Sequence, residues 1–239
     1  MRKYLLPLLA LLTVGALLAA CAPSTVTVQN APSVRSVTVT GSGMVTLTPD
    51  IAYVSIGVQT QDASAATAVS QNNAQAQAVM NAIKGFGVAD KDIQTTNFSI
   101  YPQQQYDNNG KITGIVYQVN NTVYITVRDL TRLGDLLDGA VQAGANDISS
   151  ISFDVADKTQ ALSQARKAAV ANARAQADEL TAATGTQVGE VQSISYADST
   201  APVVLNFAKS ADALSAASVP VSSGSMQITT TVTIVYALK

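Results

Sequence analysis

Apolar and polar residues alternate over residues 52–59, and this two-residue period predicts a strand with one covered face. Further strands are predicted at 93–101, 115–128, 151–155, 188–196 and 226–236. A turn is predicted at Gly41-Ser42-Gly43, which interrupts the apolar positions of 37–47. This segment is therefore expected to be either a pair of strands or one bent strand. The Asn-Gly pair within 107–110 favours a tight turn, so 93–101 and 115–128 are expected to form a hairpin.

Two further segments have the 3.6-residue period of a helix. The first is expected to begin at an Asp62 N-cap and to end near Gly85, and its predicted core stripe consists of Ala66, Val69, Ala76, Met80 and Ile83. The second covers 132–143, with Thr131 as its cap and Gly144 as its stop. Both helices have enough apolar positions to pack on a sheet.

A third helical segment has a core stripe made mostly of alanine. Asp157 and Gln160, three residues apart, predict a capping box at its start, and Gly185 predicts its end. Its stripe consists of Leu162, Ala165, Ala169, Ala173, Ala177 and Leu180. Because these side chains are small, we expect this helix to lie close against a sheet.

The order of these segments predicts an α+β fold, with helices layered on mainly antiparallel sheets. Strand, helix and strand follow one another at 52–101 and again at 148–196, which indicates an internal structural repeat. Residues 197–224 are rich in Ser and Ala and have no sustained period, so we expect a long low-complexity excursion there.

The N-terminal residues predict export and lipid attachment. Arg2 and Lys3 precede an apolar run at 5–18, as in a signal peptide, and this run is shorter than the ~20 residues that span a membrane. Leu18-Ala19-Ala20-Cys21 closely resembles the lipobox of bacterial lipoproteins. We therefore expect a signal peptide at 1–20, a lipid on Cys21 with a flexible tether over 21–33, and a folded domain at 34–239.

Composition excludes several functions. The chain has 14 basic and 16 acidic residues, a net charge of −2, which does not favour nucleic-acid binding. It has no histidine, so Ser-His or Cys-His nucleophile pairs and histidine metal sites are excluded. Its single cysteine would carry the lipid, which leaves no disulfide and no thiol for redox cycling. No cofactor or metal is expected.

Four blocks of sequence resemble one family of bacterial envelope proteins. They are 39–43 continuing to 48–58, then 121–134 with 143–146, then 165–180 with Gly185, and finally 232–236. In this order and spacing they are similar to SIMPL-domain proteins, described as periplasmic immunogenic or oxidative-stress defence proteins. The resemblance covers about residues 36–238. It implies an envelope location and an α+β fold of paired α/β subdomains, and it supplies no catalytic residues.

Other candidate chemistry has a structural explanation in each case. Gly41-Ser42-Gly43 lacks the lysine of a phosphate loop, and 107–110 lacks the ligand spacing of a calcium loop. The carboxylates of Asp147, Asp154 and Asp157 are close in sequence but are not predicted to be catalytic. The charged residues Arg166, Lys167, Arg174, Asp178 and Glu179 predict a solvated helix face with local ion pairs, or a partner-binding face.

The function expected from the sequence is that of a lipid-anchored interaction or structural module in the cell envelope, not an enzyme. Its expected partners are the membrane, through the lipid on Cys21, further copies of itself, and unidentified envelope proteins. An exposed sheet edge could pair with a neighbouring copy. Two alternatives are an oligomeric pore or conduit and a hydrolase based on unidentified carboxylates.

Overall fold

The computed structural model describes residues 35–203 and 221–239. The signal peptide, Cys21 and the tether that the sequence predicts lie outside the described residues. The described elements are β1 (Ser36–Leu47), β2 (Ile51–Asp62), α2 (Ala65–Gly85), η1 (Asp90–Asp92), β3 (Ile93–Tyr106), β4 (Ile112–Val127), η2 (Leu130–Arg132), α3 (Leu133–Gln142), β5 (Asp147–Asp154), α4 (Thr159–Thr184), β6 (Val188–Val203) and β7 (Ser225–Leu238).

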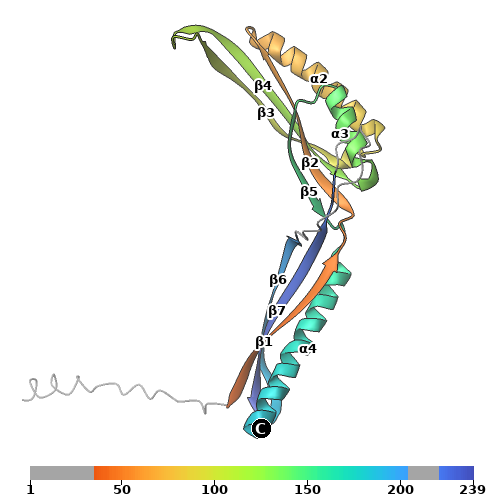
Figure 1. Cartoon of the computed structure of the whole chain (residues 1–239), viewed down its shortest axis with the longest axis vertical. Coiled ribbons are helices and arrows are strands. Elements are labelled where there is room, and N and C mark those ends of the chain that lie inside the picture. The colour runs from red at the N-terminus through yellow and green to blue at the C-terminus, as the bar shows by residue number, and fades with distance from the viewer. Residues whose placement is uncertain (1–34, 204–220) are drawn as a thin grey trace, which may run out of the picture. The chain divides into compact units, whose positions relative to one another are not determined.

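The strands form two sheets in which every neighbouring pair is antiparallel (Figure 1). Sheet A has the order β1-β7-β6 and sheet B the order β3-β4-β2-β5. Helix α4 packs on sheet A, whereas α2 and α3 pack on sheet B. The predicted α+β fold is confirmed.

The expected turn at Gly41-Ser42-Gly43 is wrong, because β1 runs through these residues without a break. Both glycines face α4. A Cβ atom at Gly41 would lie 2.2 Å from the carbonyl oxygen of Ala169, and one at Gly43 would lie 2.1 Å from that of Ala165. The glycines therefore let the backbones of strand and helix approach closely, and they have no role in a turn.

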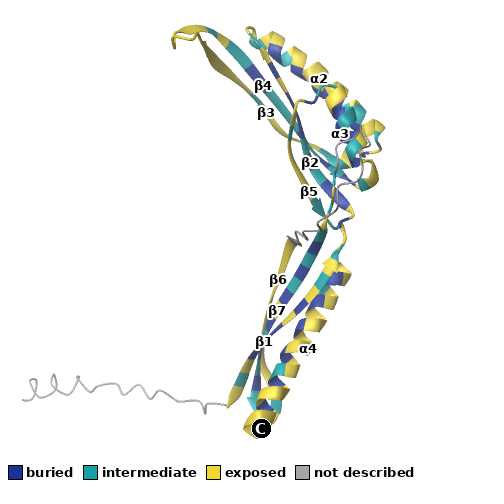
Figure 2. Cartoon of the chain, in the orientation of Figure 1, coloured by how far each residue is buried: buried dark blue, intermediate teal, exposed yellow. Residues whose placement is uncertain are grey.

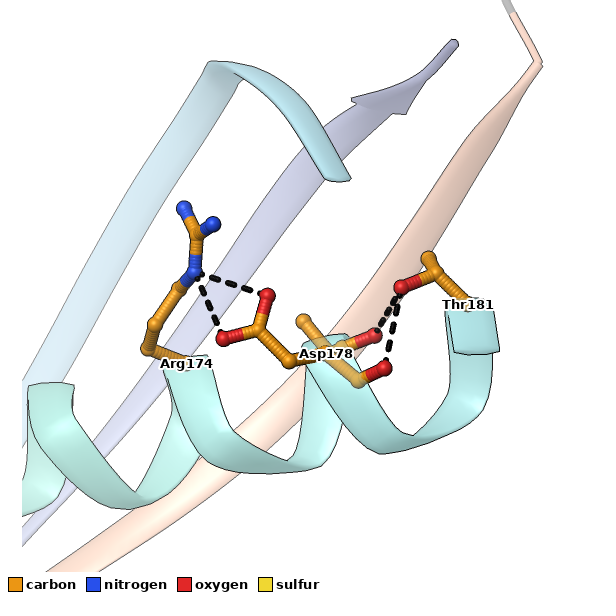
Figure 3. Close-up of polar contacts among 4 residues, drawn as sticks. Arg174, Asp178 and Thr181 are labelled. Carbon is orange, nitrogen blue, oxygen red and sulfur yellow. Dashed lines mark hydrogen bonds and ion pairs between the residues drawn. The ribbon is translucent and has the colours of Figure 1, made fainter. Parts of the chain in front are cut away.

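The alanine stripe of α4 is confirmed in its centre, where Ala165, Ala169, Ala173 and Ala177 are fully buried. At its ends the buried residues are Ala161 and Thr181 instead of Leu162 and Leu180, because burial follows a strict four-residue spacing. The Thr181 hydroxyl donates to the carbonyl oxygens of Ala177 and Asp178, which satisfies this buried group within the helix (Figure 3). Gly185 ends the helix in the left-handed conformation, as predicted.

The stripe predicted for α2 is partly wrong. Its buried residues are Ala68, Asn72, Ala76, Val79 and Ile83. The Nδ2 atom of Asn72 donates to the carbonyl oxygen of Val58 at 2.9 Å and to that of Val119 at 3.2 Å. A polar side chain thus ties α2 to two neighbouring strands, which hydrophobic periodicity alone does not reveal.

The helix starts also differ from the predicted caps. Ser64 caps α2, and its hydroxyl accepts from the Thr67 amide, while Asp62 closes the preceding turn by accepting from the Ser64 amide. Asp129, not Thr131, accepts at the start of η2. Asp157 accepts from the Thr159 amide at 2.9 Å. Within the described residues, the Gln160 side chain makes no hydrogen bond back to the Asp157 backbone, so the second bond of the predicted capping box is absent.

The predicted hairpin at 107–110 is confirmed, and its strands are longer than expected. The Asp107 carboxylate accepts from the amides of Asn109 and Lys111, each at 2.9 Å, and Gly110 has a φ of 78°.

The low-complexity excursion was expected from residue 197, but 197–203 belong to β6. Residues 204–220 lie outside the described part of the chain.

Candidate interaction surface

The edge strand β6 has an apolar strip that α4 leaves uncovered. Its residues pair in register with the helix-facing residues of β7, for example Ile194 with Ile234 and Tyr196 with Val232. Helix α4 packs over β1 and β7, so Val191, Ile194 and Tyr196 remain 53%, 58% and 62% exposed. Figure 2 shows β6 as a largely exposed strand. We call these three residues the β6 strip.

Ile194 and Tyr196 of the β6 strip form one wall of a groove of about 180 Å³. Arg166 and Val170 of α4 form the other wall, and Thr230 and Val232 of β7 form the floor. Val170 is 40% exposed, so apolar surface reaches solvent on both sides of the groove. Exposed apolar side chains gathered around one groove indicate a candidate interaction site.

An ion pair beside the groove joins helix α4 to strand β6. The Arg166 guanidinium donates to the Asp198 carboxylate and lies over the Tyr196 ring, 5.1 Å from its centroid. The Thr230 hydroxyl donates to the same carboxylate at 2.6 Å. The hydrogen bonds from Arg166 and then from Thr230 hold the pKa of Asp198 below its ordinary value, and the bond to Asp198 raises the pKa of Arg166.

A second arginine follows two helical turns along α4. Arg174 lies over the Tyr236 ring at 5.6 Å and pairs with Asp178 at 3.0 Å (Figure 3). The local ion pair expected on this helix is therefore confirmed for Arg174 and Asp178. For Arg166 it is wrong, because its partner is Asp198 on β6.

The other sequence candidates are occupied in structural contacts. Asp154 pairs with Lys158 and accepts from the Val155 amide. The backbone amide of Thr159 lowers the pKa of Asp157. Asp147 on β5 lies opposite Gly57 on β2. Across residues 35–203 and 221–239, no group of three or more His, Cys, Asp or Glu side chains is arranged to hold a metal ion.

Sequence reasoning missed Asp198 and the extent of the β6 strip. The Ser and Ala content after Tyr196 hid the continuation of the strand to Val203. One signal was available: the predicted strand at 226–236 is long, and a neighbour in the same sheet needs a similar length to pair with all of it. Nothing in the sequence marks Asp198 as the partner of Arg166.

These features define an α+β protein with two helix-backed antiparallel sheets, whose candidate site is a surface groove. None of the helices in the described segments is long and apolar enough to cross a membrane. Residues 37–236 match the SIMPL family, described as a protein of unknown function (DUF541), and the chain belongs to this family.

Several curated proteins are similar to the chain over most of its length. The 26 kDa periplasmic immunogenic protein of Brucella melitensis is 34% identical over 214 residues, which cover 85% of this chain and 84% of that protein. The uncharacterized protein YggE of Edwardsiella ictaluri is 31% identical over 196 residues, covering 82% and 80%. YggE of Escherichia coli K12 is 35% identical over 165 residues, covering 69% and 67%.

Proposed function

We propose that this chain is an exported envelope protein, held at a membrane by a lipid on Cys21, that acts as a structural module by associating with copies of itself. The exposed β6 strip on an edge strand is the observation that carries this proposal. The similarity to a protein named as periplasmic supports export. Membership of the SIMPL family, together with the similarity to this periplasmic relative, supports a role in the envelope. We extend the proposal to envelope defence under oxidative stress.

The chemistry of the β6 edge favours a second copy as its partner. Asp198 is the only charged residue in 191–201, and Arg166 already pairs with it, so two such edges meet without repulsion. Edge strands that avoid pairing usually carry charges or bulges that block it. The irregular register of β6 is confined to Val188–Ser193, and from Ile194 onward its pairing with β7 is regular, so the stretch around Ser195 remains suitable for pairing. If two β6 strands pair in antiparallel fashion about Ser195, Ile194 of each copy lies opposite Tyr196 of the other. This contact brings the apolar side chains of Ile194 and Tyr196 from both copies side by side.

The lipid supports the same function by concentrating copies on one surface. A tether at 22–33 would reach roughly 40 Å when extended, so neighbouring copies could meet. Metabolic labelling with a fatty-acid analogue tests the anchor: we expect label on the wild-type chain and none on Cys21→Ala. Equal labelling of both chains would exclude Cys21 as the lipid site.

Two differently tagged copies expressed in one cell test the association. We expect them to co-purify, and we expect Ile194→Asp to abolish this because it places a carboxylate in the β6 strip of each copy. Val141→Asp is the matched control, since Val141 on α3 is similarly exposed at 53%. Co-purification that survives Ile194→Asp would refute the proposed contact.

A further inference from the structure

The face of sheet B opposite its helices carries a connected row of uncharged amide groups. Gln61 Nε2 donates to the Oε1 atoms of Gln118 at 3.1 Å and Gln103 at 3.4 Å. Gln118 Nε2 donates to Asn120 Oδ1 at 3.3 Å, and Asn120 Nδ2 donates to the Tyr101 hydroxyl at 3.4 Å. We call these five residues the amide patch. They come from β2, β3 and β4, which lie side by side (Figure 1).

The amide patch is ordered but retains hydrogen-bonding capacity. Each carboxamide offers two N–H donors and an oxygen with two lone pairs, and the contacts within the patch use only part of them. Gln118 is 7% exposed and fixes the centre of the row, whereas Gln61 and Gln103 are open to solvent. Tyr101 is 41% exposed and adds an aromatic ring at one end. A ligand would therefore meet oriented donors and acceptors beside a ring.

The composition of the patch indicates the class of ligand. None of its five residues is charged, so it offers no counter-charge to an anion or a cation. It lacks the apolar centre that protein contacts usually bury. The centre of the patch lies on β4, which is paired on both edges, so a peptide strand added at the free edge of β3 would not lie over it. Neutral chains rich in hydroxyl and N-acetyl groups match the amides, and the C–H face of a sugar ring can stack on tyrosine.

We propose that the amide patch binds uncharged glycan chains that carry hydroxyl and N-acetyl groups, such as N-acetylhexosamine polymers. This site is separate from the β6 strip and does not depend on self-association. It gives the chain a second attachment in the envelope besides its lipid.

Co-sedimentation of the full chain in detergent with insoluble chitin and with purified peptidoglycan tests this proposal. We expect binding to both, and we expect Gln103→Ala to weaken it by about tenfold because that variant removes two donors and an acceptor. Gln104→Ala is the matched control, since it changes the next glutamine on β3, which faces the other side of the sheet. We expect this control to bind like the wild type.

Three results would overturn the proposal. Absence of binding to both polymers would exclude a glycan site. Binding to peptidoglycan without binding to chitin would assign recognition to the peptide stems. Equal effects of Gln103→Ala and Gln104→Ala would place the site away from the amide patch. An unchanged unfolding midpoint of the Gln103→Ala chain would show that this variant is folded. Reduced binding would then reflect the loss of the Gln103 side chain.

Discussion

Gly41 and Gly43 show how single residues determine the packing of sheet A. Each lacks the Cβ atom that would otherwise meet a backbone carbonyl of α4 at about 2 Å. The facing stripe of α4 consists largely of alanine, so both surfaces are small in the same place. The helix can then lie nearer to the strands than larger side chains would permit, which increases van der Waals contact.

Gly43→Ala should therefore destabilise the protein. The added methyl group must displace α4, and such overpacking costs about 1–3 kcal/mol. Urea unfolding followed by circular dichroism measures this change in the free energy of unfolding. The matched control is Gly114→Ala in β4, where an added Cβ meets nothing within 4 Å. An unchanged stability for Gly43→Ala would mean that the close approach is not maintained in solution.

The ion pair of Asp198 predicts a component of stability that depends on pH. A carboxyl whose pKa is lowered by folding stabilises the native state above its unfolded pKa of 3.8, and this contribution is lost as the pH falls through the lower folded pKa. Asp198→Asn should remove this component. Urea midpoints between about pH 5 and pH 2 should thus fall less in the variant than in the wild type.

Arg166→Gln checks the cause of that pH dependence. Its hydrogen bonds are the largest reason for the lowered pKa of Asp198, so this variant should reduce the same component. Thr230 would still donate to the carboxylate, which leaves a smaller effect. Identical pH profiles for wild type, Asp198→Asn and Arg166→Gln would contradict the assignment.

Helix α2 is held to sheet B by a polar contact as well as by its apolar stripe. Asn72 is fully buried and donates to carbonyl oxygens of β2 and β4. Its Oδ1 atom is also buried and has no protein partner in the described residues. The two donated bonds fix the position of the helix along the strands, which apolar contacts alone specify less sharply.

Asn72→Ala should lower stability by about 1–3 kcal/mol, because it removes both bonds and leaves buried polar groups unpaired. Asn73→Ala, one residue further on the exposed side of α2, is the control and should have little effect. Chemical unfolding of both variants measures the difference. Equal stabilities would show that water replaces the lost bonds.

The sequence predicts the elements of this fold better than their ends or contacts. Apolar strand patterns indicated strand residues in each of the seven strands of the described residues, although 37–47 was predicted with a turn that β1 does not have. The alanine stripe of α4 predicted close packing. Gly41 and Gly43 were assigned to a turn because glycine favours turns locally, whereas their role depends on a helix more than 120 residues away in the chain. Asn72 and Asp198 were missed because their partners are also distant in sequence.

Within the described residues, the proposed contacts of the molecule involve two surfaces: the β6 strip on sheet A and the amide patch on sheet B. They differ in chemistry, since the first is apolar on an edge strand and the second is polar on a sheet face. With the lipid proposed at Cys21, the chain would join a membrane, its own copies and a glycan. This arrangement suits a structural module and requires no catalytic centre.

The absolute mass of the full chain, measured in detergent by light scattering after size exclusion, tests self-association through β6. We expect a dimer or larger assembly for the wild type and for Val141→Asp, and a monomer for Ile194→Asp. A wild-type chain that is monomeric at all concentrations, or an Ile194→Asp chain that keeps the wild-type mass, would contradict this association.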